Sequence, residues 1–222
     1  MASVEELLSH PLLWRGEDAG LADTPAIATG FDALDRYLPG GGWPLAGISE
    51  IFVEHYGLGE LRVLMPALAA LSRCAVDSRQ WIVWIAPPFV PYAPALAHHG
   101  VDLRRILLVH PRKGSDPRGS DPKGRQKGSD PDALWAVEQA IRSQSSAATL
   151  AWVREADVTA LRRLQLGAEA HRCWTVLFRP PEAIGRSSPA ALRFRLLPGG
   201  GPAGIRIDIQ KCRGRKPRSF LL

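Results

Sequence analysis

The chain has 222 residues, of which 45% are hydrophobic and 23% are charged, and its formal net charge is +6. This composition is typical of a globular protein with a core of its own, and no apolar run approaches the roughly 20 residues that span a bilayer. The N-terminus lacks the basic and apolar regions of a signal peptide, and three cysteines without ligand-like spacing predict a reduced, cytoplasmic protein.

The positive charge is concentrated in two segments. Residues 112–131 carry a net charge of +3 and residues 211–222 carry +5, which leaves the rest of the chain slightly acidic. We predict that both segments are mobile, since the first repeats Gly-Ser-Asp-Pro three times and has no means of packing. The second predicts sequence-independent contact with the phosphates of DNA, the alternative being a solvated tail that only aids solubility. Its basic residues are Lys211, Arg213, Arg215, Lys216 and Arg218.

Apolar patterns along the chain predict strands that alternate with helices. Buried strands are expected at 48–53, 80–87, 104–111, 147–153 and 173–180, with helices at 61–76, 132–143 and 157–170. Polar and apolar residues alternate in 192–197 and 204–210 across a glycine and proline turn, which predicts a C-terminal antiparallel hairpin at a sheet edge. The order of elements predicts an α/β fold with a mostly parallel central sheet covered by helices on both faces.

We expect one core with three appendages. The core covers residues 27–210, and the insert at 112–131 interrupts it. The basic tail at 211–222 follows the core, and the segment at 1–26 precedes it.

The N-terminal segment contains an apolar cluster outside the predicted sheet. Leu12, Leu13 and Trp14 either pack onto the core of their own chain or form a contact for self-association or for a partner.

Two stretches resemble the core of the RecA recombinases. They are "IATGFDALDRYLPGGGWPLAGISEIF" at 27–52 and "WIVWIAPPFVPYAPALAHHGVDLRRILLV" at 81–109. The resemblance implies a RecA-like three-layer sandwich of the P-loop NTPase type. Within this superfamily the combination of "LPGGGWP", "GLGELRVLMPAL" and "PYAPAL" is most similar to the ImuA family, over about residues 9–211.

A phosphate-binding loop of this superfamily would lie at residues 53–61, "VEHYGLGEL". The motif G-x-x-x-x-G-K-[ST] needs glycines for close approach, a lysine for the phosphate charge and a hydroxyl for Mg²⁺. Without a gap, Val53 and Leu58 replace the glycines, Gly59 replaces the lysine and Glu60 replaces the hydroxyl residue.

A register shifted by one residue also departs from the motif. Glu54 then replaces the first glycine, Gly59 matches the second, Glu60 replaces the lysine and Leu61 replaces the hydroxyl residue. A glutamate in place of the lysine repels a triphosphate by about 4 kcal/mol at a separation of about 4 Å and an effective dielectric near 20. Gly57 and Gly59 can still make the turn, so we expect a structural corner that binds no nucleotide cofactor.

The resemblance also places the other catalytic groups of RecA proteins on unsuitable residues. The water-activating glutamate corresponds to Pro87-Pro88-Phe89, the Mg²⁺-positioning aspartate to Trp152 and the polar sensor to Arg179-Pro180. The adjacent histidines His98 and His99 have no acidic or cysteine partner at ligand spacing, so we expect no metal site. We therefore expect a protein that is not an enzyme.

The two DNA-binding loops of RecA proteins correspond to short segments here. They are residues 154–157 and about 181–191. A RecA-like grip on DNA through these loops is therefore not expected, which leaves the basic tail as the expected DNA contact.

The ImuA resemblance implies a non-catalytic accessory protein in SOS-induced translesion DNA synthesis and damage-induced mutagenesis. The implied partners are ImuB, which is an inactive relative of Y-family polymerases, the error-prone replicative-type polymerase reached through ImuB, and RecA. Two alternatives stay open: a SulA-type inhibitor of cell division that binds FtsZ, and an active RecA-like ATPase. The oligomeric state and the residues of the partner surface do not follow from the sequence.

Overall fold

The computed structural model describes residues 25–57, 59–78, 80–111, 131–200 and 204–222. The insert at 112–130, the cluster Leu12, Leu13 and Trp14, and Leu58 of the loop lie outside the described residues. Its helices are α2 (Asp32–Asp35), α3 (Met65–Ser78), α4 (Ala93–His98), α5 (Pro131–Arg142) and α6 (Val158–His171). Its strands are β1 (Ala26–Ile27), β2 (Trp43–Pro44), β3 (Gly47–Phe52), β4 (Trp81–Ile85), β5 (Ile106–Val109), β6 (Ser146–Trp152), β7 (Trp174–Arg179), β8 (Leu192–Pro198), β9 (Ile205–Cys212) and β10 (Arg218–Leu221).

Eight of these strands form one sheet in the order β10-β9-β8-β3-β7-β6-β4-β5. The six strands from β8 to β5 run parallel to one another, whereas β9 pairs antiparallel with both β8 and β10. The expectation of a mixed α/β fold with a mostly parallel sheet is confirmed.

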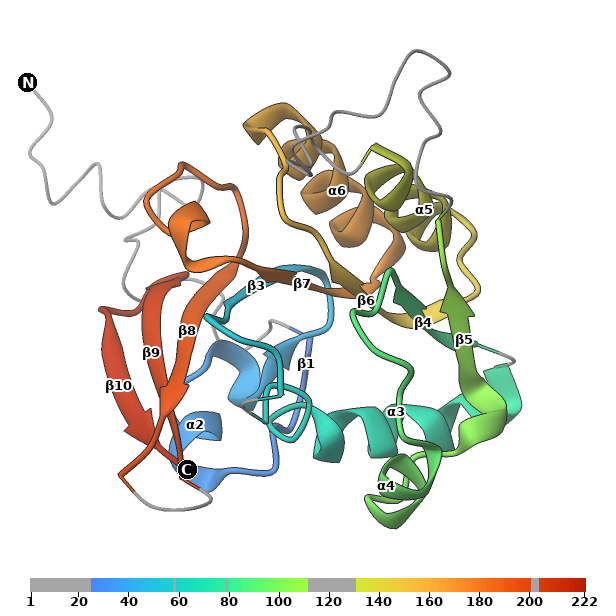
Figure 1. The fold of residues 1–222 in the computed structure, drawn as a ribbon, viewed down its shortest axis with the longest axis horizontal. Coiled ribbons are helices and arrows are strands. Elements are labelled where there is room, and N and C mark those ends of the chain that lie inside the picture. The colour runs from blue at the N-terminus through green and yellow to red at the C-terminus, as the bar shows by residue number, and fades with distance from the viewer. Residues whose placement is uncertain (1–24, 58, 79, 112–130, 201–203) are drawn as a thin grey trace, which may run out of the picture.

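Helices cover the sheet on both faces (Figure 1). Helices α3 and α4 lie on one face and α5 and α6 on the other, and a separate apolar core fills each interface. The central strands β3, β6 and β7 are buried along their whole length, because side chains on both faces of these strands meet a helix or a loop.

The apolar stripes of α5 and α6 face the sheet as the sequence predicts. Leu134, Val137 and Ile141 of α5 are buried, as are the inward residues of α6. Asp157 begins α6, since its carboxylate accepts a hydrogen bond of 2.6 Å from the backbone N–H of Ala160.

Two expectations need correction. Helix α3 begins at Met65 and not at residue 61, because the preceding residues form a separate turn in which the N–H of Leu64 bonds to the carbonyl of Leu61. Strand β5 is only partly buried, with Leu107 and Leu108 43% and 39% exposed, because it is the last strand of the sheet.

The prediction that residues 211–222 form a mobile tail is wrong. Strand β9 continues to Cys212, and β10 pairs with it along its length. Phe220 of β10 is buried, and its ring lies 5.1 Å from that of Tyr37, which follows α2. Strand pairing and the burial of Phe220 thus attach the segment to the sheet, and Figure 1 shows the C-terminus beside α2.

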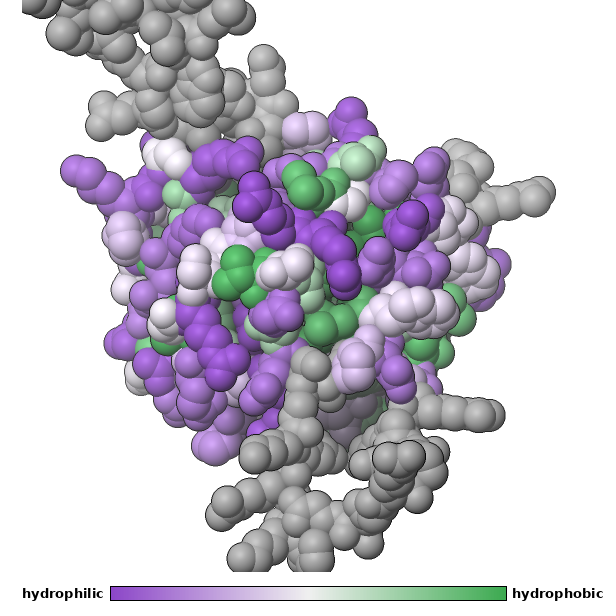
Figure 2. Space-filling view, turned by 90° about the horizontal axis from the view of Figure 1, so that it is seen from above, coloured by the Kyte–Doolittle hydropathy of each residue, from purple (hydrophilic) through white to green (hydrophobic). Residues whose placement is uncertain are grey.

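Among the described residues, no helix is long and apolar enough to cross a membrane. The face seen from above, on the side of α5 and α6, is mainly hydrophilic and carries only small, separate apolar patches (Figure 2).

Candidate functional site

The candidate site lies at the carboxyl ends of the central strands. In an open α/β sheet, ligands bind at the carboxyl ends of the parallel strands. An open cleft of about 420 Å³ is present here, between the loop that leaves β3 and the ends of β6 and β7. Its lining is Val53, Glu54, His55, Tyr56, Arg154, Pro180, Pro181 and Glu182.

The side chain of Glu60 is hydrogen-bonded to the backbone of its own loop. Its carboxylate is buried and accepts the backbone N–H of Gly57 on both oxygens, at 3.1 Å and 3.0 Å. A phosphate-binding loop aims such N–H groups at its ligand. Here the carboxylate of Glu60 accepts the N–H of Gly57. It also supplies the negative charge that the sequence predicted at this position.

The two glycines of the loop make the turn, as expected. Gly57 and Gly59 both have a φ of 93°, in the left-handed region that favours glycine. A Cβ on Gly59 would lie 2.8 Å from the Cδ1 atom of Ile205, so the loop packs closely on the start of β9.

The outer residues of the loop are engaged with the protein. Glu54 forms an ion pair with Arg195 of β8, and Leu61 packs partly buried against the core. These contacts account for the acidic residue and the apolar residue at these two positions.

The residue that the RecA resemblance aligns with a Mg²⁺-positioning aspartate is part of an aromatic cluster. Trp152 ends β6, and its ring stacks on Phe178 at 4.7 Å and lies 5.7 Å from that of Trp84. Among the described residues, no group of three His, Cys, Asp or Glu side chains is placed to hold a metal ion.

A buried ionic cluster that the sequence analysis missed lies beneath the site. Glu50 of β3 accepts hydrogen bonds from Arg179 of β7 at 2.6 Å and from Arg193 of β8 at 2.8 Å. Glu50 and Arg179 are 0% exposed. The sequence contained one sign of this cluster. Single charged residues of opposite sign lie within segments that are otherwise apolar and were predicted to be strands.

The same two arginines hold the loops at the end of the sheet. Arg179 donates to the carbonyl of Ala156 at 3.4 Å, and Arg193 donates to that of Ala183 at 3.2 Å. The two segments that the RecA resemblance aligns with DNA-binding loops are therefore attached to the sheet by a shared cluster.

A lysine extends this attachment. Lys211 donates to the carbonyl of Ser188 at 2.9 Å, and burial together with the nearby charge of Arg193 lowers its pKa. Lys211 is thereby less suited to a DNA contact than the sequence analysis expected.

The remaining basic residues of 211–222 project from the edge of the sheet. Arg213 approaches Glu169 at 3.7 Å, and Arg218 lies over the rings of Tyr37 and Phe220. Arg215 and Lys216 are exposed in the turn between β9 and β10. The five predicted residues thus lie on one antiparallel pair, with different partners.

Comparison with known proteins gives two likenesses. No family model matches the chain. Protein ImuA, from two strains of Caulobacter vibrioides, is 28% identical over 221 residues, covering 90% of this chain and 83% of that protein, and the predicted resemblance to ImuA is confirmed. The crystal structure of SulA from Pseudomonas aeruginosa is 23% identical, with a TM-score of 0.42, and covers 60% of this chain and 97% of that chain. A TM-score this low supports no conclusion about fold or function.

Replacing Glu50 by Gln should strongly destabilise the protein. The change leaves Arg179 and Arg193 buried without a counter-charge, and breaking a buried ion pair in this way costs about 3–5 kcal/mol. The free energy of unfolding, measured by urea titration, should fall by that amount. The matched control is Glu54→Gln, which removes a partly exposed pair and should cost less than about 1 kcal/mol. Equal destabilisation of the two variants would contradict the assigned role.

Proposed function

We propose that this protein is a non-catalytic accessory protein of SOS-induced translesion DNA synthesis and damage-induced mutagenesis. The observation that carries the proposal is its similarity to Protein ImuA along 90% of its length. On this proposal it acts in the cytoplasm, at the nucleoid, by binding proteins of the same mutagenesis system.

We propose further that the core is RecA-like. The motif resemblance at 27–52 and 81–109 supports this, as does the order of a buried strand, a glycine-bearing loop and a helix at β3 and α3. The parallel sheet with helices on both faces is the architecture that such a core requires.

The internal carboxylate supports a role without catalysis. Glu60 takes the N–H of Gly57 and places a negative charge where a triphosphate would lie. Trp152 and Pro88 stand where the resemblance puts the Mg²⁺-positioning and water-activating carboxylates. A site with this set of residues has no group suited to activate water or hold the metal.

The expected direct partner is ImuB, which would connect the protein to the error-prone polymerase; RecA is a further candidate. We place the protein contact at the loop between β4 and α4. Phe89, Val90 and Tyr92 are 70%, 83% and 72% exposed there. Exposed aromatic residues held by neighbouring prolines suit a binding surface, because their side chains give up little conformational freedom when a partner binds.

The expected DNA contact is the turn between β9 and β10. Arg215 and Lys216 are exposed at its surface, beside Arg213 and Arg218. Such a contact would bind phosphates without reading sequence.

The purified protein should not hydrolyse ATP in the presence of Mg²⁺. Radiolabelled ATP should give the same background release of phosphate with the unchanged protein and with the Glu60→Gln variant. An active RecA recombinase serves as the positive control. Mg²⁺-dependent turnover that disappears in the Glu60→Gln variant would favour the active ATPase.

The full chain should co-purify with ImuB, and the loop variant Phe89→Ser/Tyr92→Ser should weaken the complex at least about tenfold, as removal of aromatic anchors does. Trp135→Ser is the matched control, because it removes an exposed aromatic residue from α5 on the other side of the sheet.

Three results of this experiment would count against the proposal. Absence of an ImuB complex would remove its main support, and binding to FtsZ would favour the SulA-type alternative. An equal effect of the control variant would reject the loop as the contact.

Binding to DNA should weaken with salt, and the Arg215→Gln/Lys216→Gln variant should have a shallower slope of log affinity against log salt. The slope should fall by about 0.9 for each phosphate of duplex DNA that the variant no longer neutralises. Point changes are needed because truncation at residue 211 would remove β10 and expose its neighbour. Arg162→Gln/Arg163→Gln, on α6, is the control with an equal reduction in charge. Fluorescence anisotropy measures the slopes, and an identical slope in all three proteins would contradict the contact.

A further inference from the structure

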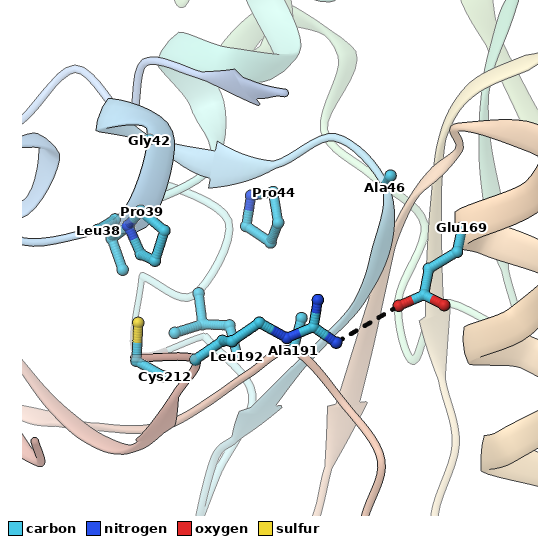
Figure 3. Close-up of a pocket in the computed structure, with 10 residues that line it drawn as sticks. Leu38, Pro39, Gly42, Pro44, Ala46, Glu169, Ala191, Leu192 and Cys212 are labelled. Carbon is cyan, nitrogen blue, oxygen red and sulfur yellow. Dashed lines mark ion pairs between the residues drawn. The ribbon is translucent and has the colours of Figure 1, made fainter. Parts of the chain in front are cut away.

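A small apolar pocket lies at the end of the sheet opposite to the candidate site (Figure 3). It opens beside the residues that precede β3 and has a volume of about 50 Å³. A single water needs about 10–15 Å³ by the same measure, so the pocket has room for an aliphatic side chain. Its apolar lining comes from Leu38, Pro39, Pro44, Ala46, Leu192 and Cys212.

The environment of Cys212 reflects this apolar lining. Burial raises the pKa of its thiol to about 11, so the group is neutral at physiological pH. The charged groups of the pocket lie at its mouth, where Arg213 and Glu169 approach to 3.7 Å, as the dashed line in Figure 3 marks. The pocket is thus an apolar hollow with a charged rim.

The chain enters the described structure at the wall of this pocket. Pro25 is the first described residue, and its carbonyl accepts the N–H of Leu45 at 2.9 Å. Ala26 pairs with Pro44 in the small β1–β2 sheet. Leu45 lies between two lining residues, so the preceding 24 residues are tethered next to the opening.

We propose that this pocket is the docking site of the N-terminal segment of the same chain, with one leucine side chain of the cluster Leu12-Leu13-Trp14 inserted in the pocket and the rest of the cluster packed at its opening. Ten residues lie between Trp14 and Pro25, so eleven Cα–Cα steps join the two. Fully extended, they span at most about 36–40 Å, which is enough to reach the opening and turn back into it. A tether of this length gives the segment an effective concentration of the order of millimolar, which favours its own chain over a second copy in dilute solution.

The charge of the tether suits the rim. Residues 15–24 contain Arg15, Glu17, Asp18 and Asp23, an excess of acidic over basic groups. Arg213 lies at the mouth of the pocket beside Glu169, and Arg215, whose N–H bonds to the carbonyl of Cys212, adds a second cation, so the two cations outnumber the one carboxylate. The apolar anchor and the acidic tether thus match the two parts of the pocket separately.

Trypsin cleavage after Arg15 tests the docking in the full chain. The bond between Arg15 and Gly16 should be protected, because it follows the anchor directly. The segment variant Leu12→Ala/Leu13→Ala/Trp14→Ala and the pocket-filling variant Ala46→Trp should each speed cleavage by at least about tenfold, since proteolysis follows the population of the open form and each variant removes the burial of an apolar side chain in the pocket. Mass spectrometry of the released N-terminal peptide measures the rate.

The control is Leu21→Ala, which removes an apolar residue of the tether and should leave the cleavage rate unchanged. Equal rates in the unchanged protein and in the segment variant would overturn the proposal. A faster rate in the segment variant with no effect of a folded Ala46→Trp protein would also overturn it, because the anchor would then dock elsewhere. Protection that increases with protein concentration would assign the pocket to a second copy and reject the intramolecular form. Where Ala46→Trp fails to fold, Ala191→Leu fills the pocket from a second lining residue and takes its place, because the segment variant alone does not locate the docking site.

Discussion

The carboxylate of Glu50 joins three adjacent strands that are distant in the sequence. It holds Arg179 and Arg193 by one oxygen each, in a region from which water is excluded. Two cations surround one anion, and the carbonyl oxygens of Ala156 and Ala183 accept two further guanidinium N–H groups that Glu50 does not bind. The alignment of β3, β7 and β8 and the positions of two loops therefore depend on the same group.

In the loop after β3, as at Glu50, a buried carboxylate of the protein itself accepts hydrogen bonds from groups that need an acceptor. Backbone N–H groups in a glycine-rich turn need an acceptor, and a nucleotide protein supplies it as a ligand phosphate. In this protein Glu60 supplies it from the next turn of the chain, so the corner is complete without a ligand. The strand, the loop and the helix can thus form without a bound phosphate.

The parts of the structure that the sequence predicted are those that depend on local pattern. Continuous apolar runs predicted β3, β4, β6 and β7, and the Asp157 cap predicted the start of α6. The ionic cluster was missed because Glu50 and its arginines meet only through strand order, which no local pattern contains. At the site, the negative charge of Glu60 was predicted, but its hydrogen bond depends on the left-handed turn at Gly57.

The basic segment at 211–222 is the part of the structure that differs most from the prediction made from sequence. Net charge alone predicted a mobile tail, yet the segment forms β10, which pairs with β9 and buries Phe220. A turn between two paired strands restricts the positions of Arg215 and Lys216 far more than a tail would. The loss of freedom on binding DNA is then smaller, but the charges can meet phosphates only on one edge of the sheet. That edge lies beside the pocket at Cys212, so occupation of the pocket by an acidic segment would lower the positive potential available to DNA.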